Sequence, residues 1–298
     1  MEKKERQGLP EKIREIEIRA KKAVNALFSG EYHSVFKGRG LMFAESRPYT
    51  PGDDVRAMDW KVTARAGHPY VKVFQEEREL TLMLLVDMSA SGRFGSGKGF
   101  KSEAAAELCA SLAFSAIRNN DKVGLIAFTN GVELFIAPRK GRTHVLRLIR
   151  EVLTFKPVGK GTDIRSALEF MSRALKKKAI VFLVSDFFDE GYDKTMGSIA
   201  RKHDLVAVRV FDRREMELPP LGGYLAMEDA ESGERIALDP SNPRLAREYM
   251  RMAGLEAVAR SKTFMAAGVD EVVVDTAGSY VEPLVRFFKL REQRKRFG

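Results

Sequence analysis

Two short hydrophobic runs, each followed by a carboxylate, stand out in the pattern of hydrophobic and polar positions. Residues 82–86 precede Asp87, and residues 179–184 precede Ser185 and Asp186. Uninterrupted runs of this length, bounded by small polar residues, predict strands that are buried on both faces, as in a parallel sheet. Segments with helical spacing alternate with such strands, so we expect a doubly wound α/β fold.

The same pattern predicts the remaining elements. Asn130-Gly131 between two hydrophobic runs predicts a hairpin, and Pro243 is well placed to begin a long helix. The predicted helices span residues 10–28, 102–118, 143–155, 164–175, 196–202, 243–267 and the segment after Pro283. The further predicted strands span residues 123–128, 132–136, 205–211 and 271–275, with an exposed hairpin formed by residues 225–227 and 235–238.

Changes in composition divide the chain into four parts. Residues 1–30 hold the first helix. In residues 31–79, Gly and Pro interrupt short β-prone pieces, which predicts a small β-rich subdomain. Residues 80–280 carry the alternating strands and helices of the α/β domain, and residues 281–298 form a C-terminal helix with a basic tip.

Oxygen-bearing side chains follow both of the runs that end in a carboxylate. Asp87, Ser89 and Ser91 are spaced two residues apart, Asp186 follows the second run, and Thr162 lies in a loop before a predicted helix. The carboxyl ends of parallel strands meet at one edge of a sheet, where ligands bind. Hydroxyl and carboxylate oxygens are hard donors that suit Mg²⁺. The alternative is that these residues only cap the following helices.

Together the five residues resemble the metal-ion-dependent adhesion site of von Willebrand factor A-like domains. The string Asp87-x-Ser89-x-Ser91, the loop residue Thr162 and the strand-end Asp186 occur in the expected order. The resemblance implies a mostly parallel sheet with one antiparallel edge hairpin. It also implies that Ser89, Ser91 and Thr162 bind Mg²⁺, or Mn²⁺, directly. Asp87 and Asp186 would hold waters around the ion, and one open position would accept a Glu or Asp of a partner protein.

A second stretch identifies a family. Residues 49–60 read Tyr-x-Pro-Gly-Asp-Asp-x-Arg-x-x-Asp-Trp. Followed by a von Willebrand factor A-like half, this string resembles an uncharacterised bacterial and archaeal family whose members are commonly encoded beside MoxR-type AAA+ ATPases. The resemblance covers about residues 30–215. It implies a metal-dependent protein-binding module that works with such an ATPase.

The carboxylates of this string allow two interpretations. Consecutive carboxylates after a Pro-Gly pair are typical of a turn and a short helix capped by Asp53 or Asp54, with Arg56 and Asp59 paired. Alternatively, Asp53, Asp54 and Asp59 form a second metal or acid–base site. We favour the turn, because it explains the residues by local chemistry alone.

The glycine-rich segment 92–99 has the Gly-x4-Gly-Lys spacing of a phosphate-binding loop. Gly99, however, stands where such a loop supplies a hydroxyl to Mg²⁺. We therefore expect a flexible rim beside the metal loop rather than a nucleotide site. Arg93 and Lys98 in this rim are predicted to steer an acidic partner towards the metal.

Charge and hydropathy narrow the class of protein. The net charge of +10 allows an anionic partner, but the basic residues are not concentrated in a stripe with aromatic residues, which argues against nucleic acid. The single cysteine excludes an internal disulfide. No hydrophobic stretch approaches the ~20 residues that span a bilayer. We therefore expect a soluble, cytoplasmic protein without a membrane span.

The alternative function is a Mg²⁺-dependent hydrolase or phosphatase that uses Asp87 and Asp186. Such chemistry usually needs a further acid or base near the metal. The four histidines, His33, His68, His144 and His203, follow none of the metal loops. The sequence therefore favours a binding module over an enzyme.

Overall fold

The chain forms two compact units in a computed structural model that describes residues 9–27, 41–76, 79–94, 100–218, 223–228 and 235–297. The main unit consists of Met1–Val35 and Thr81–Gly298, and the small unit consists of Phe36–Leu80. Along the chain, the small unit is therefore an insertion within the main unit.

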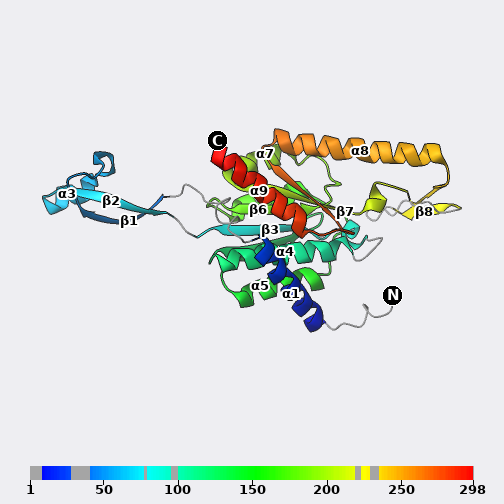
Figure 1. Cartoon of the computed structure of the whole chain (residues 1–298), viewed down its shortest axis with the longest axis horizontal. Helices are drawn as coiled ribbons and strands as arrows, with labels where there is room; N and C mark the ends of the chain where they lie inside the picture. Colours follow the sequence, from blue (N-terminus) through cyan, green and yellow to red (C-terminus); the bar gives the residue numbers. More distant parts are fainter. Residues whose placement is uncertain are drawn as a thin grey trace. The chain divides into compact units, whose positions relative to one another are not determined.

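A six-stranded sheet forms the centre of the main unit (Figure 1). In spatial order, its strands are β10 (Asp270–Asp275), β7 (Asp204–Phe211), β6 (Ile180–Ser185), β3 (Thr81–Asp87), β4 (Lys122–Phe128) and β5 (Val132–Arg139). All neighbours are parallel except β4 and β5, which form the antiparallel edge hairpin. From β3 the chain continues to β4 on one side and later returns to β6 on the other. Their carboxyl ends therefore form a topological switch point, where open α/β sheets bind ligands.

Helices cover both faces of this sheet (Figure 1). One face carries α4 and α5, with α1 packed on α4 and α9 beside β10, and the other carries α6, α7 and α8. The helices are α1 (Leu9–Leu27), α4 (Lys101–Arg118), α5 (Arg142–Thr154), α6 (Ile164–Ala174), α7 (Asp193–Lys202), α8 (Pro243–Ala266) and α9 (Val281–Phe297). Short 3-10 helices, η2 (Ala90–Arg93) and η3 (Arg213–Glu215), follow β3 and β7.

Two-sided burial explains the hydrophobic run of β3. All of its residues from Leu82 to Val86 are buried. Met83 and Leu85 belong to one cluster with Ile164 of α6 and Met196 of α7. Because side chains alternate along a strand, the others point to the face that α4 covers. Each buried aliphatic side chain contributes about 2 kcal/mol of hydrophobic stabilisation, so the strand fixes the loop that follows it.

The small unit is an antiparallel strand pair with two short helices in the connection. β1 (Leu41–Pro48) pairs with β2 (Tyr70–Glu76), and η1 (Val55–Ala57) and α3 (Trp60–Ala66) lie between them in the chain. The backbone N–H of Asp59 donates to the carbonyl of Tyr70 at 2.8 Å, which ties the start of α3 to β2. Gly67 ends α3 with a φ of 73°, a left-handed conformation that glycine adopts without strain.

The structure confirms the predicted fold class, a mostly parallel α/β sheet with an antiparallel edge hairpin. The exposed hairpin is also present, as β8 (Leu225–Glu228) and β9 (Arg235–Leu238). The predicted helix 164–175 is α6, and the predicted strand 179–184 is β6. In the part of the chain that the structure describes, no helix is both long and apolar enough to cross a membrane.

Candidate metal centre

The loop after β3 gathers three of the five predicted site residues. The backbone N–H of Ser89 donates to Asp87 Oδ1 at 2.9 Å, so the carboxylate holds the start of the loop. Ser89 is the N-cap residue of η2, and its hydroxyl lies 3.0 Å from the hydroxyl of Ser91. Ser89 is 2% exposed. The two-residue spacing in the sequence thus becomes a pair of hydroxyls beside a buried carboxylate.

The end of β6 brings the fourth residue to the same sheet edge. β3 and β6 are parallel neighbours, with Val86 opposite Val184. Ser185 Oγ donates to Asp87 Oδ2 at 2.6 Å, which joins the two strand ends. Asp186 follows, and the next residue, Phe187, is buried with a φ of 60°. A bulky residue in the left-handed region is a strained conformation of the kind found at functional sites.

Lys101, the first residue of α4, places a buried ammonium group in this cluster. It is 3% exposed. Its Nζ donates to Asp186 Oδ2 at 2.9 Å, contacts the carboxylate of Glu215, and lies 5.9 and 5.8 Å from the rings of Phe94 and Phe188. Burial alone would lower the pKa of Lys101, but the charges of Asp186 and Glu215 outweigh burial and raise it. The two carboxylates therefore favour the charged form of Lys101.

Thr162 lies on a third loop at this edge. The carbonyl of Lys160 accepts a hydrogen bond from the Ala90 N–H at 3.2 Å, which holds this loop against η2. The N–H of Asp163 donates to the carbonyl of Thr129, the residue after β4, at 2.8 Å. Asp163 itself caps α6 through Ser166 N–H at 2.8 Å. The three loops that carry the five predicted residues are thus bonded to one another or to neighbouring strand ends.

A cavity of about 20 Å³ lies behind the two carboxylates. Its lining includes Asp87, Ser91, Lys101 and Asp186, but Thr162 is not among the described residues that form it. A water needs about 10–15 Å³ of such space, so the cavity has room for one water or one small ion. The structure therefore brings Asp87, Ser91 and Asp186 together around one small space.

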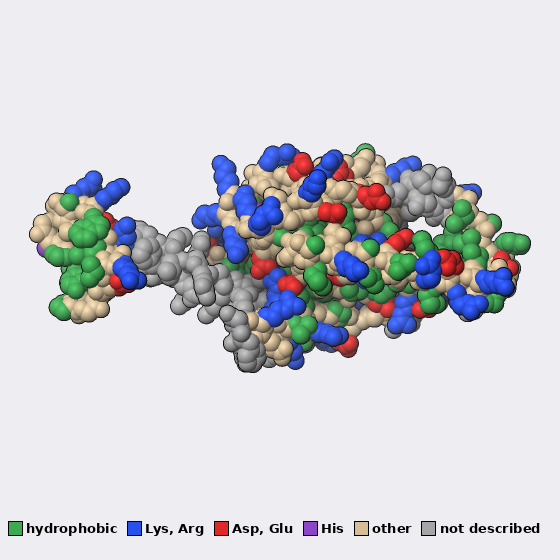
Figure 2. Space-filling model, turned by 90° about the horizontal axis from the view of Figure 1, so that it is seen from above, with side chains coloured by type: hydrophobic (Ala, Val, Ile, Leu, Met, Phe, Trp, Pro, Cys, Tyr) green, Lys and Arg blue, Asp and Glu red, His purple; other side chains and the backbone are tan. Residues whose placement is uncertain are grey.

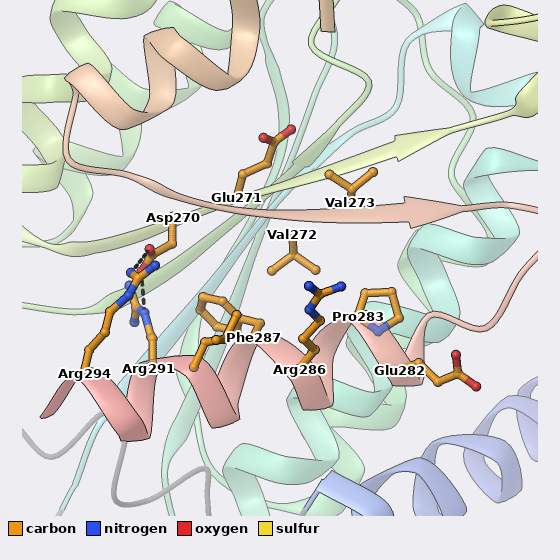
Figure 3. Close-up of a pocket in the computed structure, with 11 residues that line it drawn as sticks. Asp270, Glu271, Val272, Val273, Glu282, Pro283, Arg286, Phe287, Arg291 and Arg294 are labelled. Carbon is orange, nitrogen blue, oxygen red and sulfur yellow. Dashed lines mark hydrogen bonds and ion pairs between the residues drawn. The ribbon is translucent and has the colours of Figure 1, made fainter. Parts of the chain in front are cut away.

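A larger cavity, of about 500 Å³, lies between β10 and α9 (Figure 3). Its walls share no residue with the small cavity. Arg291 and Arg294 on its α9 side are bonded to Asp270 at 2.6 and 2.8 Å, while Glu271 points away from α9 and is bonded to Arg209 at 3.0 Å. Most of the charged side chains that line this cavity are paired with one another or with Arg209, so they are not available to a ligand. We therefore do not take this cavity as the functional site, although it is the larger of the two.

The electrostatics of the small cavity follow from burial. Burial, together with the negative charge of Asp186, raises the pKa of Asp87 to about 6, although bonds from Ser185 and Ser89 oppose the shift. In the described part of the chain, no group of three or more Asp, Glu, His or Cys side chains is placed to hold a metal. A metal at this edge would therefore need hydroxyl ligands, which Ser89 and Ser91 carry.

Sequence reasoning missed Lys101, Glu215 and the role of Ser185. A lysine at the start of a helix is unfavourable next to the positive end of the helix dipole, so Lys101 indicated a nearby carboxylate. Glu215 gave no such sign, because it lies in η3 after a different strand. Ser185 was visible as the residue before Asp186, but only the β3–β6 pairing reveals its bond to Asp87.

The aspartates of the small unit have a different environment. Arg47 donates to both oxygens of Asp53, at 2.8 and 2.6 Å, and these bonds hold the pKa of Asp53 well below its usual range. Asp54 caps η1 by accepting from Arg56 N–H at 2.9 Å. Asp59 caps α3 and accepts from Ser46 Oγ at 2.7 Å. The expected Arg56–Asp59 pair is wrong, because Ser46 and the N-terminal amides of α3 take the carboxylate instead.

Each described histidine has a ring nitrogen within hydrogen-bond distance of a backbone group. His144 Nε2 lies 2.8 Å from the carbonyl of Val123, and His203 Nδ1 accepts from Ala179 N–H at 3.3 Å. His68 Nδ1 lies 2.9 Å from the carbonyl of Ala66. Several further predictions concern positions outside the described residues or side chains, namely His33, the rim residues 95–99 with Lys98, the Arg93 side chain and the basic tip at Lys295 and Arg296.

Several solved structures have a similar fold. One is an aerotolerance-related membrane protein from Bacteroides fragilis, with a TM-score of 0.46, 16% identity, and coverage of 72% of this chain and 99% of that chain. The SpRpn10 VWA domain has a TM-score of 0.38, 11% identity, and coverage of 70% and 95%. Proximal thread matrix protein 1 from the mussel byssus, with a zinc-occupied MIDAS motif, has a TM-score of 0.36, 16% identity, and coverage of 44% and 38%.

The cytoplasmic location predicted from the sequence has to be corrected. The similar structure from Bacteroides fragilis is described as a membrane protein, which overturns that prediction. The prediction was wrong because it relied on the single cysteine and on the absence of a long hydrophobic stretch, and neither feature determines where a protein is located.

Sequence comparison identifies the family. The uncharacterized protein Rv1480 of Mycobacterium tuberculosis is 30% identical over 286 residues, which cover 94% of this chain and 89% of the relative. The family model described as "Protein of unknown function DUF58" matches residues 45–259, a range that contains both the aspartates of the small unit and the candidate metal centre. The chain therefore belongs to the DUF58 family.

Proposed function

We propose that this protein is a metal-dependent protein-interaction module. The hydroxyls of Ser89, Ser91 and Thr162 would hold Mg²⁺, or Mn²⁺, with Asp87 and Asp186 balancing its charge. When bound, the ion supplies an electrophilic position for a carboxylate of a partner protein.

The charge of the buried cluster is the observation that carries this proposal. The ammonium group of Lys101 is paired with Asp186 and Glu215, and Asp87 lines the same small cavity. Three carboxylates and one ammonium leave a formal charge of −2 when all are ionised, which one divalent cation cancels. Burial, and after it the negative charge of Asp186, raises the pKa of Asp87, and a bound cation would oppose both effects.

The proposed partner is a protein with an exposed Glu or Asp, and the family resemblance favours a MoxR-type AAA+ ATPase or one of its clients. A metal–carboxylate bond in a partly dry interface can anchor a complex whose other contacts are weak. Thr162 is not among the described residues that line the small cavity. We therefore assign Thr162 to the side that faces the partner.

Two alternatives remain to be separated from this proposal by experiment. A hydrolase needs an acid or base beside the ion, and the carboxylates of Asp186 and Glu215 favour the charged form of Lys101, which is not a base. In a vestigial site, Lys101 would replace the metal altogether. Direct measurement of metal binding distinguishes the proposal from the vestigial site, and a phosphatase assay tests the hydrolase.

Calorimetric titration of the protein with Mg²⁺ and Mn²⁺ tests the metal. We expect one ion per chain, and a loss of affinity of at least about 100-fold in Asp87→Ala and in the double variant Ser89→Ala with Ser91→Ala. Asp54→Ala is the matched control, because it removes an aspartate of the small unit. Unchanged binding in the variants of the candidate centre, or no binding by the wild type, would contradict the proposal.

Surface-binding kinetics with a candidate ATPase test the partner. We expect the complex to form in Mg²⁺ and to dissociate in a chelator, and Thr162→Ala to weaken it at least about tenfold. Thr154→Ala in α5 is the control, because its hydroxyl bonds only within its own helix, to the carbonyl of Arg150 at 2.8 Å. Equal affinity in all conditions would exclude a metal-mediated contact.

A further inference from the structure

The small unit exposes a tryptophan, Trp60, at the start of α3. We define the tip surface as Val55, Arg56, Trp60, Lys61 and Arg65, all of them exposed. Trp60 is 67% exposed and Val55 61%. Exposure of such large apolar side chains loses the hydrophobic stabilisation that their burial would give, so we take Trp60 and Val55 as candidates for contact with a partner.

All three aspartates of residues 49–60 form hydrogen bonds that hold the segment carrying this surface. Asp53 is held by Arg47 and by the N–H and hydroxyl of Thr50, each at 2.9 Å. Asp54 fixes the start of η1, and Asp59 fixes the start of α3. These bonds account for the three aspartates as structural residues, and they do not involve the side chains of Arg56 and Trp60 in the same string.

The geometry of α3 groups the exposed side chains by type. Residues four apart lie on the same side of a helix. Lys61 and Arg65 therefore share one side of α3, next to the side that carries Trp60. Figure 2 shows the small unit at its left end, with hydrophobic side chains gathered on one face and Lys and Arg at their margins.

The charge of the tip surface defines the chemistry of its partner. Arg56, Lys61 and Arg65 are basic, and the exposed acid between residues 54 and 66 is Asp54, whose Oδ1 is already bonded to a backbone N–H. Trp and Arg are the residue types that most often carry binding energy at protein interfaces. A surface of this kind complements a protein segment that carries acidic side chains around a hydrophobic pocket.

We propose that the tip surface is a docking site for an acidic segment of another protein, in which a hydrophobic pocket receives Trp60 while Asp or Glu side chains pair with Arg56 and Lys61. This site is independent of the metal centre, and it adds a second point of attachment to the proposed function. The hydrogen bonds of Asp53, Asp54 and Asp59 hold this segment in the free protein. Binding of a partner therefore does not have to order the segment, which favours affinity.

Trp60 is also the reporter for the test, because it is the only tryptophan of the chain. We propose to titrate the full-length protein with tryptophan-free peptides of about 20 residues that combine Glu with Leu and Phe. In matched peptides, Gln or Lys replaces Glu. The acidic peptides are expected to move Trp60 emission to shorter wavelength and to protect it from acrylamide, with at least about tenfold higher affinity than the Gln peptides.

Charge reversal supplies the control. Arg56→Glu with Lys61→Glu keeps the reporter and should weaken the acidic peptides at least about tenfold while allowing the Lys peptides to bind. Arg165→Glu with Lys194→Glu makes the same change in charge on α6 and α7 and should leave the titration unchanged. The chelator should have no effect, which separates this site from the metal centre.

Several outcomes would overturn the proposal. Emission typical of a buried indole in the free protein would mean that Trp60 is already covered. A response to Gln peptides equal to that with Glu would remove the role of charge. A response to single-stranded RNA or to anionic vesicles without a response to peptides would assign the surface to another partner. A shift that depends only on protein concentration would indicate a second copy of the chain.

Discussion

The aspartates of the small unit and those of the sheet edge look alike in the sequence, where both follow turn residues or strand ends. In the structure their environments are opposite. Asp53 lies at the surface among donors from Arg47 and Thr50, and its pKa falls well below the usual range. Asp87 is buried beside the like charge of Asp186, and its pKa rises to about 6.

The difference separates structural carboxylates from carboxylates available to a ligand. A carboxylate that accepts bonds from an arginine and from backbone N–H groups is stabilised as an anion and needs nothing more. A buried carboxylate next to another is short of positive charge, and a cation can supply it. We therefore assign Asp87 and Asp186 at the sheet edge to the proposed metal site, and Asp53 to holding the turn of the small unit. The following changes test that assignment.

Lys101→Met should have the largest effect. Removing the ammonium leaves Asp186 and Glu215 buried without their counter-charge, which typically costs about 3–5 kcal/mol. For a unit of this size, this corresponds to a fall in Tm on the order of 10 °C in metal-free buffer at neutral pH. Calorimetric unfolding measures it.

A second variant and the addition of Mg²⁺ extend the test of Lys101. The double variant Lys101→Met with Glu215→Gln removes one negative charge as well and should regain part of the loss. Mg²⁺ should stabilise Lys101→Met more than the wild type, because the variant lacks the internal cation. A fall in Tm no larger than that of Lys61→Met, an exposed lysine of the small unit, would mean that the buried cluster is not held by charge.

Asp87→Asn should have a smaller effect of opposite sign. The pKa of Asp87 is about 6 in the folded chain and about 3.9 in an unfolded chain, so the folded state binds the proton more tightly. The contribution of Asp87 to stability is therefore fully present below pH ~4 and lost as pH rises through ~6, by on the order of 3 kcal/mol. Without metal, Asp87→Asn should be more stable than the wild type at pH 7.5 and similar to it at pH 4.

Urea unfolding at the two pH values measures this difference. Glu169→Gln, an exposed residue of α6, is the control and should show no such dependence on pH. Adding Mg²⁺ should reverse the order at pH 7.5, because only the wild type binds it. A wild type that is more stable than Asp87→Asn at pH 7.5 without metal would show that Asp87 is fully satisfied, like Asp53.

Sequence reasoning predicted the sheet because burial on both faces leaves an uninterrupted run such as 82–86, and it predicted the meeting of Asp87 with Asp186 because parallel strands align their ends. It could not predict the partners of these carboxylates. Lys101 and Glu215 are separated by more than 100 residues in the chain, and only the β3, β6 and β7 neighbourhood brings them together. For the small unit, it identified the turn but paired Asp59 with the wrong residue.

Asp59→Ala should disturb the small unit alone. It removes the bonds to the Lys61 and Val62 N–H groups and to Ser46 Oγ. Amide exchange at Lys61 and Val62 should rise several-fold, because the first turn of α3 loses its cap. Hydrogen exchange followed by NMR measures it. Equal acceleration at the amides of β3 would mean that the aspartate supports the main unit as well.

Arg47→Lys should have the smallest effect and tests how firmly the turn is held. The planar guanidinium of Arg47 bonds both oxygens of Asp53, and an ammonium group cannot reproduce that pair of parallel bonds. The N–H and hydroxyl of Thr50 still donate to Asp53 in the variant. The pKa of Asp53 should therefore rise but remain below that of an unbonded aspartate, and Arg47→Ala should raise it further. Carboxyl NMR titration measures these values, with the exposed Glu169 of α6 as an internal reference. If both variants leave the pKa of Asp53 where it is in the wild type, the arginine is not what holds the turn, and the contrast with Asp87 must have another cause.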